Sequence, residues 1–368
     1  MQRTLPSAFS RGLFIIRRMN ITNRVNAFSS LGSFLKQFVT KTKAPELTNL
    51  NNKFYEEFLL VIDQTEIYNR WFIKENIIQA IEAWSENLSK EQLQKWISPY
   101  SFKNIPKKIG VIQAGNIPLV GFHDFLSVLI SGHVFIGKAS SKDNKLPKII
   151  SKILIEIEPR FNEKIFWEDR LNDIDAIIAT GSDNSSRYFE YYFGSKPNII
   201  RKNRSSWAVI TGRESEKDLY NLGKDIFAYY GLGCRNISKL FVPDNYDFKP
   251  LFEAIEPFQK VYNNNKYANN YDYNQSVYLM NLEKFLQNGF LILKEEIGHH
   301  SPLSVIYYEQ YSKIETVQSR IENQRNEIQC ICYSDGEISD SIPFGETQEP
   351  KLWDYADQID TLKFLSEL

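Results

Sequence analysis

Short β-type runs alternate with helical stretches over most of the chain, and this alternation is the feature that most restricts its fold. From residue 107 a strand pattern ("KKIGVIQAG") is followed by a helical pattern ("IPLVGFHDFLSVLISG") and a second strand pattern ("HVFIGKAS"). Because strand–helix–strand units produce parallel strands with crossover helices, the pattern predicts a doubly wound α/β sheet. Residues 19–95 instead repeat apolar positions at helical spacing, which predicts an α-helical opening section.

The alternation continues with helical patterns in "KLPKIISKILIEIE" and "SDNSSRYFEYYF" and strand patterns in "DAIIATG" and "WAVIT". After Cys234, strand patterns recur in "ISKLFVP", "SVYLMN", "PLSVIYYE" and "EIQCICYS", interleaved with helical stretches around Phe252, Phe285 and Ile314. These segments predict a second α/β lobe. Residues 261–275 are dense in Asn and Tyr, and we expect an ordered loop there, although a bias toward Asn codons would give the same composition.

The charge balance argues against nucleic acids and anionic membranes as partners. Lys and Arg total 44 against 45 for Asp and Glu in the 368 residues, so there is no long-range basic field to attract polyanions. No apolar run is long enough for a transmembrane helix, and we expect no membrane span. Three sparse cysteines suit a reducing compartment. We therefore predict a cytoplasmic protein that acts on a small molecule.

Residues 1–18 precede an amphipathic pattern that starts at Met19. They contain four arginines and no acidic residue, and their apolar piece "GLFII" is too short for a secretory signal. We predict a disordered extension or the product of an upstream start codon, and composition alone leaves an organellar transit peptide open.

The stretch "YYGLGCRNIS" (residues 229–238) admits two interpretations. A dinucleotide-binding loop needs a strand before its first glycine and a helix after its last. Here a helical pattern precedes the glycines, a strand pattern follows them, and Asn236 occupies the third glycine position. The order excludes a phosphate loop. A cysteine on a glycine-flanked turn is well placed to be an exposed nucleophile, whereas the residue type alone is more typical of a small buried side chain.

Six segments in order resemble the aldehyde dehydrogenase superfamily: "AGNIPLVG", "GKAS", "ATGS", "GLGC", "EEIGHHSPLSV" and "IPFG". The resemblance implies an aldehyde dehydrogenase-like α/β fold, with a doubly wound Rossmann-type cofactor domain and an α/β catalytic domain. It also implies that Cys234 is the catalytic nucleophile and that Asn116 holds the oxyanion together with the backbone N–H of Cys234. The residues alone leave Asn116 open as a turn residue before Pro118.

The same resemblance implies residues that hold a nicotinamide cofactor. Lys138 contacts the adenosine ribose, and its charge together with Ser140 favours NADPH, with NADH as the alternative. Gly181 and Ser182, at a strand end that opens a helix, suit a phosphate group. Glu296 matches the acid on the nicotinamide ribose, although the following "GHHSP" departs from the family's Phe-Gly-Pro and leaves a surface carboxylate open.

Four further residues receive no chemical role. His299 and His300 point to opposite sides of an extended chain and lack a Cys or acid at ligand spacing, so we predict no metal site. Cys330 and Cys332 share one face of a strand pattern and are predicted to pack in the core.

Within the superfamily, "YGLGCRNISKLFVP" and "LWDYADQIDTLKFL" look most like the fatty acyl-CoA reductases of bacterial luminescence. Hydrolytic members carry a general-base Glu upstream of the cysteine, and the matching stretch "IIRKNRSSWAVIT" has no acid. An enzyme without that base is suited to exchanging the acyl group with a thiol rather than losing it to water. We predict reduction of a long-chain acyl-CoA to the aldehyde by NADPH through an acyl-Cys234 intermediate. The alternatives are a cysteine-dependent acyltransferase or thioesterase and a non-catalytic nucleotide-binding partner of a multienzyme complex.

These expectations divide the chain into four parts. Residues 1–18 are the extension, residues 19–212 the helical section with the NAD(P)-binding domain, and residues 213–340 the catalytic cysteine domain. Residues 341–368 form a tail that packs on the cofactor domain or a subunit interface. The superfamily exchanges strands between subunits, which implies a homo-oligomer, and the acyl donor is a CoA thioester or an acyl carrier.

Overall fold

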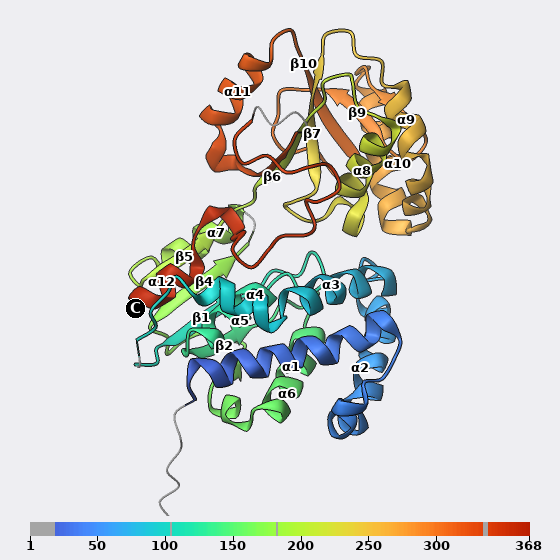
Figure 1. Ribbon diagram of the computed structural model, residues 1–368. Helices are drawn as coiled ribbons and strands as arrows, with labels where there is room; N and C mark the ends of the chain where they lie inside the picture. Colours follow the sequence, from blue (N-terminus) through green and yellow to red (C-terminus); the bar gives the residue numbers. More distant parts are fainter. Residues whose placement is uncertain (1–18, 104, 182, 334–337) are drawn as a thin grey trace, which may run out of the picture.

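Two α/β lobes, each built on its own sheet, make up the described part of the chain (Figure 1). The computed structural model describes residues 19–103, 105–181, 183–333 and 338–368, so the predicted extension of residues 1–18 lies outside it. The lobe with the five-stranded sheet also carries the N-terminal helices. The other lobe, with the six-stranded sheet, lies above it in Figure 1.

The helical opening section is confirmed. Asn20 and Asn23 form a capping box that begins the first helix. Aromatic side chains from these helices, among them Phe28 and Phe58, are fully buried in one core with the first sheet. No helix of the described ranges is long and apolar enough to cross a membrane. The section consists of α1 Ile21–Thr40, α2 Thr48–Tyr68, α3 Lys74–Asn87 and α4 Lys90–Ile97.

The first sheet is parallel throughout, with the strand order β3-β2-β1-β4-β5, which confirms the doubly wound α/β prediction. The chain winds outward from β1 on one side and then returns to place β4 and β5 on the other. The carboxyl ends of β1 and β4 therefore flank the point where the winding reverses, and α/β sheets bind ligands at such a point. The elements are β1 Lys108–Ile112, α5 Phe122–Ile130, β2 Val134–Lys138, α6 Leu146–Ile157, β3 Ile165–Trp167, β4 Ala176–Thr180, α7 Asp183–Phe193 and β5 Asn198–Arg201.

The second sheet has the order β11-β6-β7-β10-β9-β8, and only its pair β8·β9 is antiparallel among the described strands. It confirms the predicted second α/β lobe. The helices α8, α9 and α10 lie together on one side of it in Figure 1, and α11 lies on the other. The elements are β6 Ser205–Val209, α8 Glu216–Phe227, η3 Ala228–Gly231, β7 Ile237–Pro243, α9 Lys249–Ile255, η4 Glu256–Asn263, α10 Asn265–Met280, β8 Leu286–Gln287, β9 Ile292–Glu295, β10 Val305–Tyr311, α11 Ile314–Asn323 and β11 Ile328–Cys332.

The strand β6 lies in the second sheet, between β11 and β7. We expected it in the cofactor-binding part, which we ended at residue 212. The change of lobe instead falls between Arg201 and Ser205. The pattern "WAVIT" indicates a buried strand but not its neighbours, because strand preferences depend on packing that local sequence does not specify.

Helix α10 occupies a stretch that we expected to be a loop followed by a strand. The Asn264 side chain caps it by accepting two backbone N–H groups of the first turn. Because Asn and Tyr fill both faces of this helix, the helical period was hidden in the composition. Its buried side chains recur at helical spacing and are Tyr267, Tyr271, Asn274 and Tyr278.

Other differences concern short segments. Phe285 lies between α10 and β8 rather than in a helix. The strands β3, β5, β8 and β9 were not predicted, and each has only two to four residues. A run of that length is too short to show a period of two.

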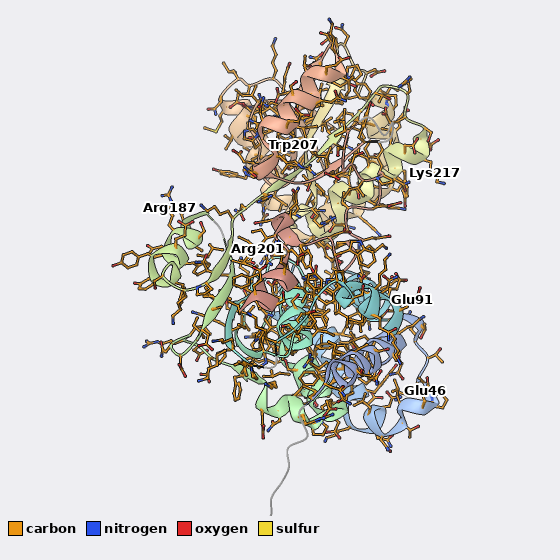
Figure 2. The ribbon with its side chains drawn as sticks, turned by 60° about the vertical axis from the view of Figure 1, so that its left-hand side comes forward. Glu46, Glu91, Arg187, Arg201, Trp207 and Lys217 are labelled. Atoms are coloured by element: carbon orange, nitrogen blue, oxygen red, sulfur yellow. The ribbon has the colours of Figure 1, made fainter. Side chains whose placement is uncertain are left out.

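The C-terminal strap, residues 345–368, runs from the second lobe to the first (Figure 1). Near its start, the backbone N–H groups of Gly345 and Thr347 donate to the buried carboxylate of Asp225 at 2.6 and 3.1 Å. Its end forms η6 Ala356–Gln358 and α12 Thr361–Glu367. There Thr361 accepts from Arg201, which Figure 2 labels where the lobes meet. The strap therefore ties both lobes together.

Candidate active site

Cys234 lies between α8 and β7, on a turn whose Leu232 contacts Asn116 of the first lobe. Three successive residues before it adopt left-handed backbone conformations: Tyr229 (φ 50°), Tyr230 (φ 61°) and Gly231 (φ 78°). Such conformations are strained for non-glycine residues and persist only where the surroundings enforce them. They reverse the chain sharply and leave Cys234 exposed.

The cysteine turn is held by two buried polar side chains that we did not predict. The Asn236 amide accepts the N–H of Gly233 at 2.8 Å and donates to the carbonyls of Asp225 and Ala228, each at 2.9 Å. The Ser206 hydroxyl of β6 donates to the carbonyl of Cys234 at 2.8 Å. In the sequence Asn236 stood out only as a missing third glycine, and its position two residues after the cysteine was the one signal for this role.

Asn116 meets the cysteine turn from the first lobe. It lies in the loop between β1 and α5, and its side-chain amide donates to the carbonyl of Leu232 at 2.7 Å. A primary amide carries a second N–H. The structure therefore brings the Asn116 side chain to the turn that carries Cys234.

The loop of Asn116 depends on a buried carboxyl that we also missed. One oxygen of Asp143 accepts the N–H of Leu119 at 3.0 Å, and Leu119 has a left-handed backbone (φ 58°). The other oxygen of Asp143 has no hydrogen-bond partner among the described residues. Burial raises the pKa of Asp143 to about 7, and the Leu119 N–H opposes this shift.

The thiol of Cys234 is reachable from the junction of the lobes, yet protein surrounds its sulfur closely. This desolvation raises the pKa of Cys234 to about 11, while the positive charge of Arg235 acts in the opposite direction. The Nε of Arg235 donates to the strap carbonyl of Thr347 at 2.6 Å. The resting thiol is therefore protonated at neutral pH.

The residues expected to hold a cofactor in the first lobe lie near strand ends. Lys138 ends β2 and is exposed, and Ser140 lies in the turn that follows. Gly181 follows β4, and a Cβ there would come within 2.8 Å of the Ser185 Cβ in α7. Ser182 lies outside the described residues. The end of β2 thus carries a cation and a hydroxyl, and at the end of β4 a glycine packs closely against the start of α7. These features suit the binding of a dinucleotide.

Glu296 lies directly after β9 in the second lobe. A hydrogen bond from Lys294 at 2.8 Å lowers its pKa, so it stays ionised at neutral pH. The loop that Glu296 begins reaches β7, the strand that follows the turn of Cys234, where the Ser301 hydroxyl donates to the carbonyl of Ser238 at 2.9 Å. Glu296 is thus linked to the cysteine turn through this loop.

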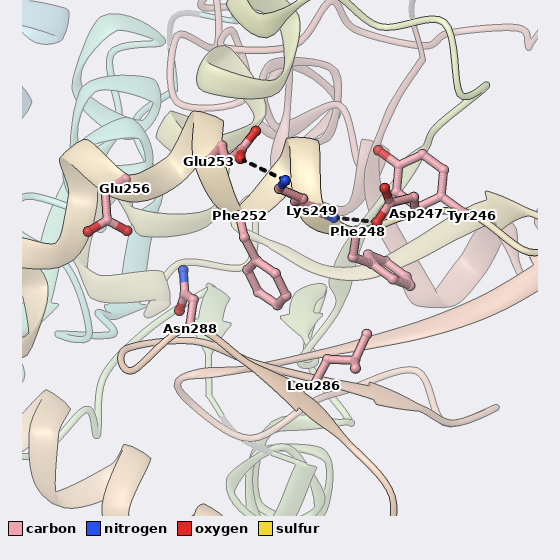
Figure 3. A pocket seen from close by; sticks show the side chains of 9 residues that line it. All are labelled: Tyr246, Asp247, Phe248, Lys249, Phe252, Glu253, Glu256, Leu286 and Asn288. Atoms are coloured by element: carbon pink, nitrogen blue, oxygen red, sulfur yellow. Dashed lines mark hydrogen bonds and ion pairs between the residues drawn. The ribbon is translucent and has the colours of Figure 1, made fainter.

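Hollows in the described ranges lie in or beside the second lobe. One, of about 600 Å³, lies at the lobe junction beside the cysteine turn and is lined by Phe227, Tyr229 and Tyr230, with Glu66, Lys224 and Lys260 also lining it. The other lies between α9 and β8, where Phe252 extends toward the turn of Leu286 and Asn288 (Figure 3). None of the predicted site residues lines either hollow.

The other side chains without an assigned role are also placed. His299 stacks on Trp207 with ring centroids 5.6 Å apart. Cys330 and Cys332 are buried in β11. No group of three or more His, Cys, Asp or Glu residues in the described ranges is arranged to hold a metal ion.

Aldehyde dehydrogenases of known structure share this architecture. An indole-3-acetaldehyde dehydrogenase in complex with NAD+ aligns with a TM-score of 0.61 at 13% identity, over 88% of this chain and 74% of its own. Aldehyde dehydrogenase 21 from Physcomitrella patens, in complex with the product succinate, aligns with a TM-score of 0.59 at 13% identity, over 94% of this chain and 88% of its own. The aldehyde dehydrogenase KauB from Pseudomonas aeruginosa aligns with a TM-score of 0.59 at 12% identity, over 86% of this chain and 73% of its own. No protein-family model and no curated protein matches the sequence.

The chain therefore has the α/β fold of the aldehyde dehydrogenases, with lobes that correspond to their cofactor and catalytic domains. At this level of identity the likeness concerns the fold. The narrower resemblance to fatty acyl-CoA reductases and the roles of the individual residues are proposals.

Proposed function

We propose that the protein is an NADPH-dependent acyl-CoA reductase that forms a covalent acyl-Cys234 intermediate. The observation that carries this proposal is the contact between Asn116 and the turn of Cys234. It brings an amide donor of one lobe to the nucleophile of the other, as acyl transfer to a cysteine requires. The substrate is an acyl thioester of CoA or of an acyl carrier, with a long fatty chain, and the enzyme works as a homo-oligomer.

The first step is an exchange of thioesters. The Cys234 sulfur attacks the acyl carbonyl, its bond to carbon forms, and the bond from carbon to the sulfur of CoA breaks. The proton of the Cys234 thiol ends on the released CoA thiol, so charge and atoms balance. The second N–H of the Asn116 amide and the backbone N–H of Cys234 stabilise the oxyanion, and loss of one such donor typically costs about 2.7–4 kcal/mol.

Bound NADPH would supply a hydride to the acyl carbon. Lys138, Ser140, Gly181 and Ser182 would hold its adenosine and phosphate groups, and Glu296 would bind the nicotinamide ribose. The resulting thiohemiacetal alkoxide would collapse to the aldehyde as the bond from carbon to the Cys234 sulfur breaks, and the released thiolate would take up a proton from solvent.

The lack of an acidic residue in the stretch that contains β6, "IIRKNRSSWAVIT", supports reduction over hydrolysis. The β6 side chain that contacts the nucleophile backbone is the Ser206 hydroxyl, which donates to the carbonyl of Cys234. A hydroxyl with an ordinary pKa far above neutrality is a poor general base for water.

Absorbance of reduced nicotinamide with purified protein, NADPH and a long-chain acyl-CoA tests the proposal. We expect loss of NADPH in step with aldehyde formation, none with Cys234→Ala, and a rate reduced about 100 to 1,000 fold with Asn116→Ala. Asn198→Ala, which alters an exposed side chain in β5, is the matched control. Full activity of Cys234→Ala would refute the mechanism, and CoA release without loss of NADPH would indicate an acyltransferase or thioesterase.

A further inference from the structure

A lysine is fully buried inside the catalytic lobe. Lys239 lies in β7, the strand that begins directly after the cysteine turn, and none of its side chain is exposed to solvent. An ammonium group in such a place costs several kcal/mol unless its donors are matched. Lys239 is one of the least expected residues in this core, and its partners explain why it is there.

The partners of Lys239 belong to one loop and one neighbouring strand. Its ammonium group forms an ion pair with Glu309 of β10 and donates to the carbonyls of Ile297 and Gly298, each at 2.9 Å. The carbonyl of Glu296 lies at 3.4 Å. A single cation thus binds three successive carbonyls of the segment that begins with Glu296.

Neighbouring contacts hold the same segment from the other side. Arg320 of α11 donates to the carbonyl of Ile297 at 3.1 Å. The ring of His299 stacks on Trp207 of β6, which Figure 2 labels inside this lobe. Ser206, beside Trp207, bonds to the carbonyl of Cys234. The loop of Glu296 and the cysteine turn are therefore fixed to the same two strands, β6 and β7.

We propose that Lys239 is a positioning residue that sets the Glu296 loop against Cys234, and that it thereby controls binding of the nicotinamide cofactor but not acylation of the cysteine. The carboxylate of Glu296 is one residue from carbonyls that the ammonium group fixes, so loss of that group releases the loop. The cysteine turn keeps its own anchors, Asn236 and Ser206, neither of which bonds to Lys239 in the described structure. This inference rests on the proposed function.

The test compares Lys239→Met and Lys239→Arg with the wild type. The exposed Lys217 of α8, labelled in Figure 2, provides the control variant Lys217→Met. Binding of NADPH is followed by quenching of tryptophan fluorescence, and acylation by the burst of CoA released without cofactor. Amide hydrogen exchange of residues 296–300 reports on the loop itself.

For Lys239→Met we expect the dissociation constant of NADPH to rise about 10 to 100 fold, because displacing a binding group such as the Glu296 carboxylate by about 1 Å can have an effect of that size. The CoA burst stays within about twofold of the wild type, and exchange at residues 296–300 becomes faster. Lys239→Arg keeps the charge and recovers part of the affinity. Should the methionine variant fail to fold, the arginine variant still tests the inference. We expect it to show smaller increases in the NADPH dissociation constant and in the hydrogen exchange of residues 296–300.

Two results would overturn the inference. One is unchanged hydrogen exchange at residues 296–300, and the other is a burst that falls in parallel with cofactor affinity. Failure of the proposed function is a separate outcome, seen as a wild type that consumes no NADPH. In that case the exchange of residues 296–300 still tests whether Lys239 holds the loop.

Discussion

At the scale of single residues, the reactivity of Cys234 is limited by its surroundings. The protein around the sulfur raises its pKa to about 11. Arg235, the nearest cation in sequence, donates its Nε to Thr347 of the strap. The thiol is thus accessible but mostly uncharged at neutral pH, and any reaction of its thiolate includes the cost of ionisation.

The rate of Cys234 alkylation should therefore rise steeply with pH. Below its pKa the thiolate fraction grows about tenfold for each pH unit, so we expect roughly a 100-fold faster reaction with iodoacetamide at pH 9 than at pH 7. Cys234→Ala supplies the background from the buried Cys330 and Cys332. A rate that levels off near pH 8 would show instead that the free enzyme stabilises the thiolate.

Asn236 and Ser206 illustrate what sequence can and cannot predict about a site. Cys234 and Asn116 were chosen from the residues that surround them, and the structure brings the Asn116 side chain to the cysteine turn. The anchors Ser206 and Asp143 act through contacts 28 and 24 residues apart in the chain, and Asn236 reaches back 11 residues to Asp225. Such contacts leave no local pattern, and a buried amide or hydroxyl looks like a surface residue in the sequence.

At the scale of elements, the alternation of strand and helix predicted both sheets, because each βα unit has its own apolar period. It did not assign β6 to a sheet, since its partners β7 and β11 are determined by tertiary pairing. It missed α10 because tyrosines supply the buried face of that helix. The loop between β1 and α5, which carries Asn116, is held by a single carboxyl group, that of Asp143.

The titration of Asp143 should appear in the stability of that junction. Burial raises its pKa from 3.8 to about 7, so the folded chain binds the proton more tightly than the unfolded chain. Its contribution to stability is present below the unfolded pKa and is lost as the pH rises toward 7. Asp143→Asn keeps an oxygen for the Leu119 N–H and cannot ionise.

We therefore expect Asp143→Asn to raise the free energy of unfolding at pH 8 by on the order of 3 kcal/mol and to change it little at pH 4. Urea denaturation at the two pH values measures this, with the exposed Asp169→Asn as a control. An equal effect of Asp143→Asn at both pH values would show that the carboxyl does not titrate in this range.

At the scale of the whole molecule, the strap closes the junction of the two lobes. Its first residues bond to Asp225 in the second lobe. Further along, carbonyls of Leu352 and Leu365 bond to the rings of His123 and His133 in the first lobe, at 2.9 and 2.8 Å. Both histidines are anchors of a segment rather than members of the candidate site.

Acid should weaken this junction. Burial lowers the pKa of both His123 and His133, so the unfolded chain binds protons more readily. The contribution of these two histidines to stability is therefore present above the pKa of 6.5 that they have in the unfolded chain. It is lost as the pH falls through their lower pKa values in the folded chain. Glutamine at both positions can still donate to a carbonyl but does not titrate.

The double variant His123→Gln/His133→Gln should accordingly show a smaller drop of its thermal midpoint between pH 7.5 and pH 5 than the wild type. Thermal unfolding followed by circular dichroism measures both proteins. The exposed His300→Gln serves as the control. Equal drops in the wild type and the double variant would assign the acid sensitivity to other groups.

The strap follows both lobes in the sequence, and this order has a consequence for biosynthesis. On the ribosome the two lobes emerge before the segment that joins them, and domains generally fold as units from the N-terminal side. The bonds of the strap to Asp225, His123 and His133 can therefore form only after both lobes have been synthesised. The final tie between the lobes is thus a late event in the synthesis of this chain.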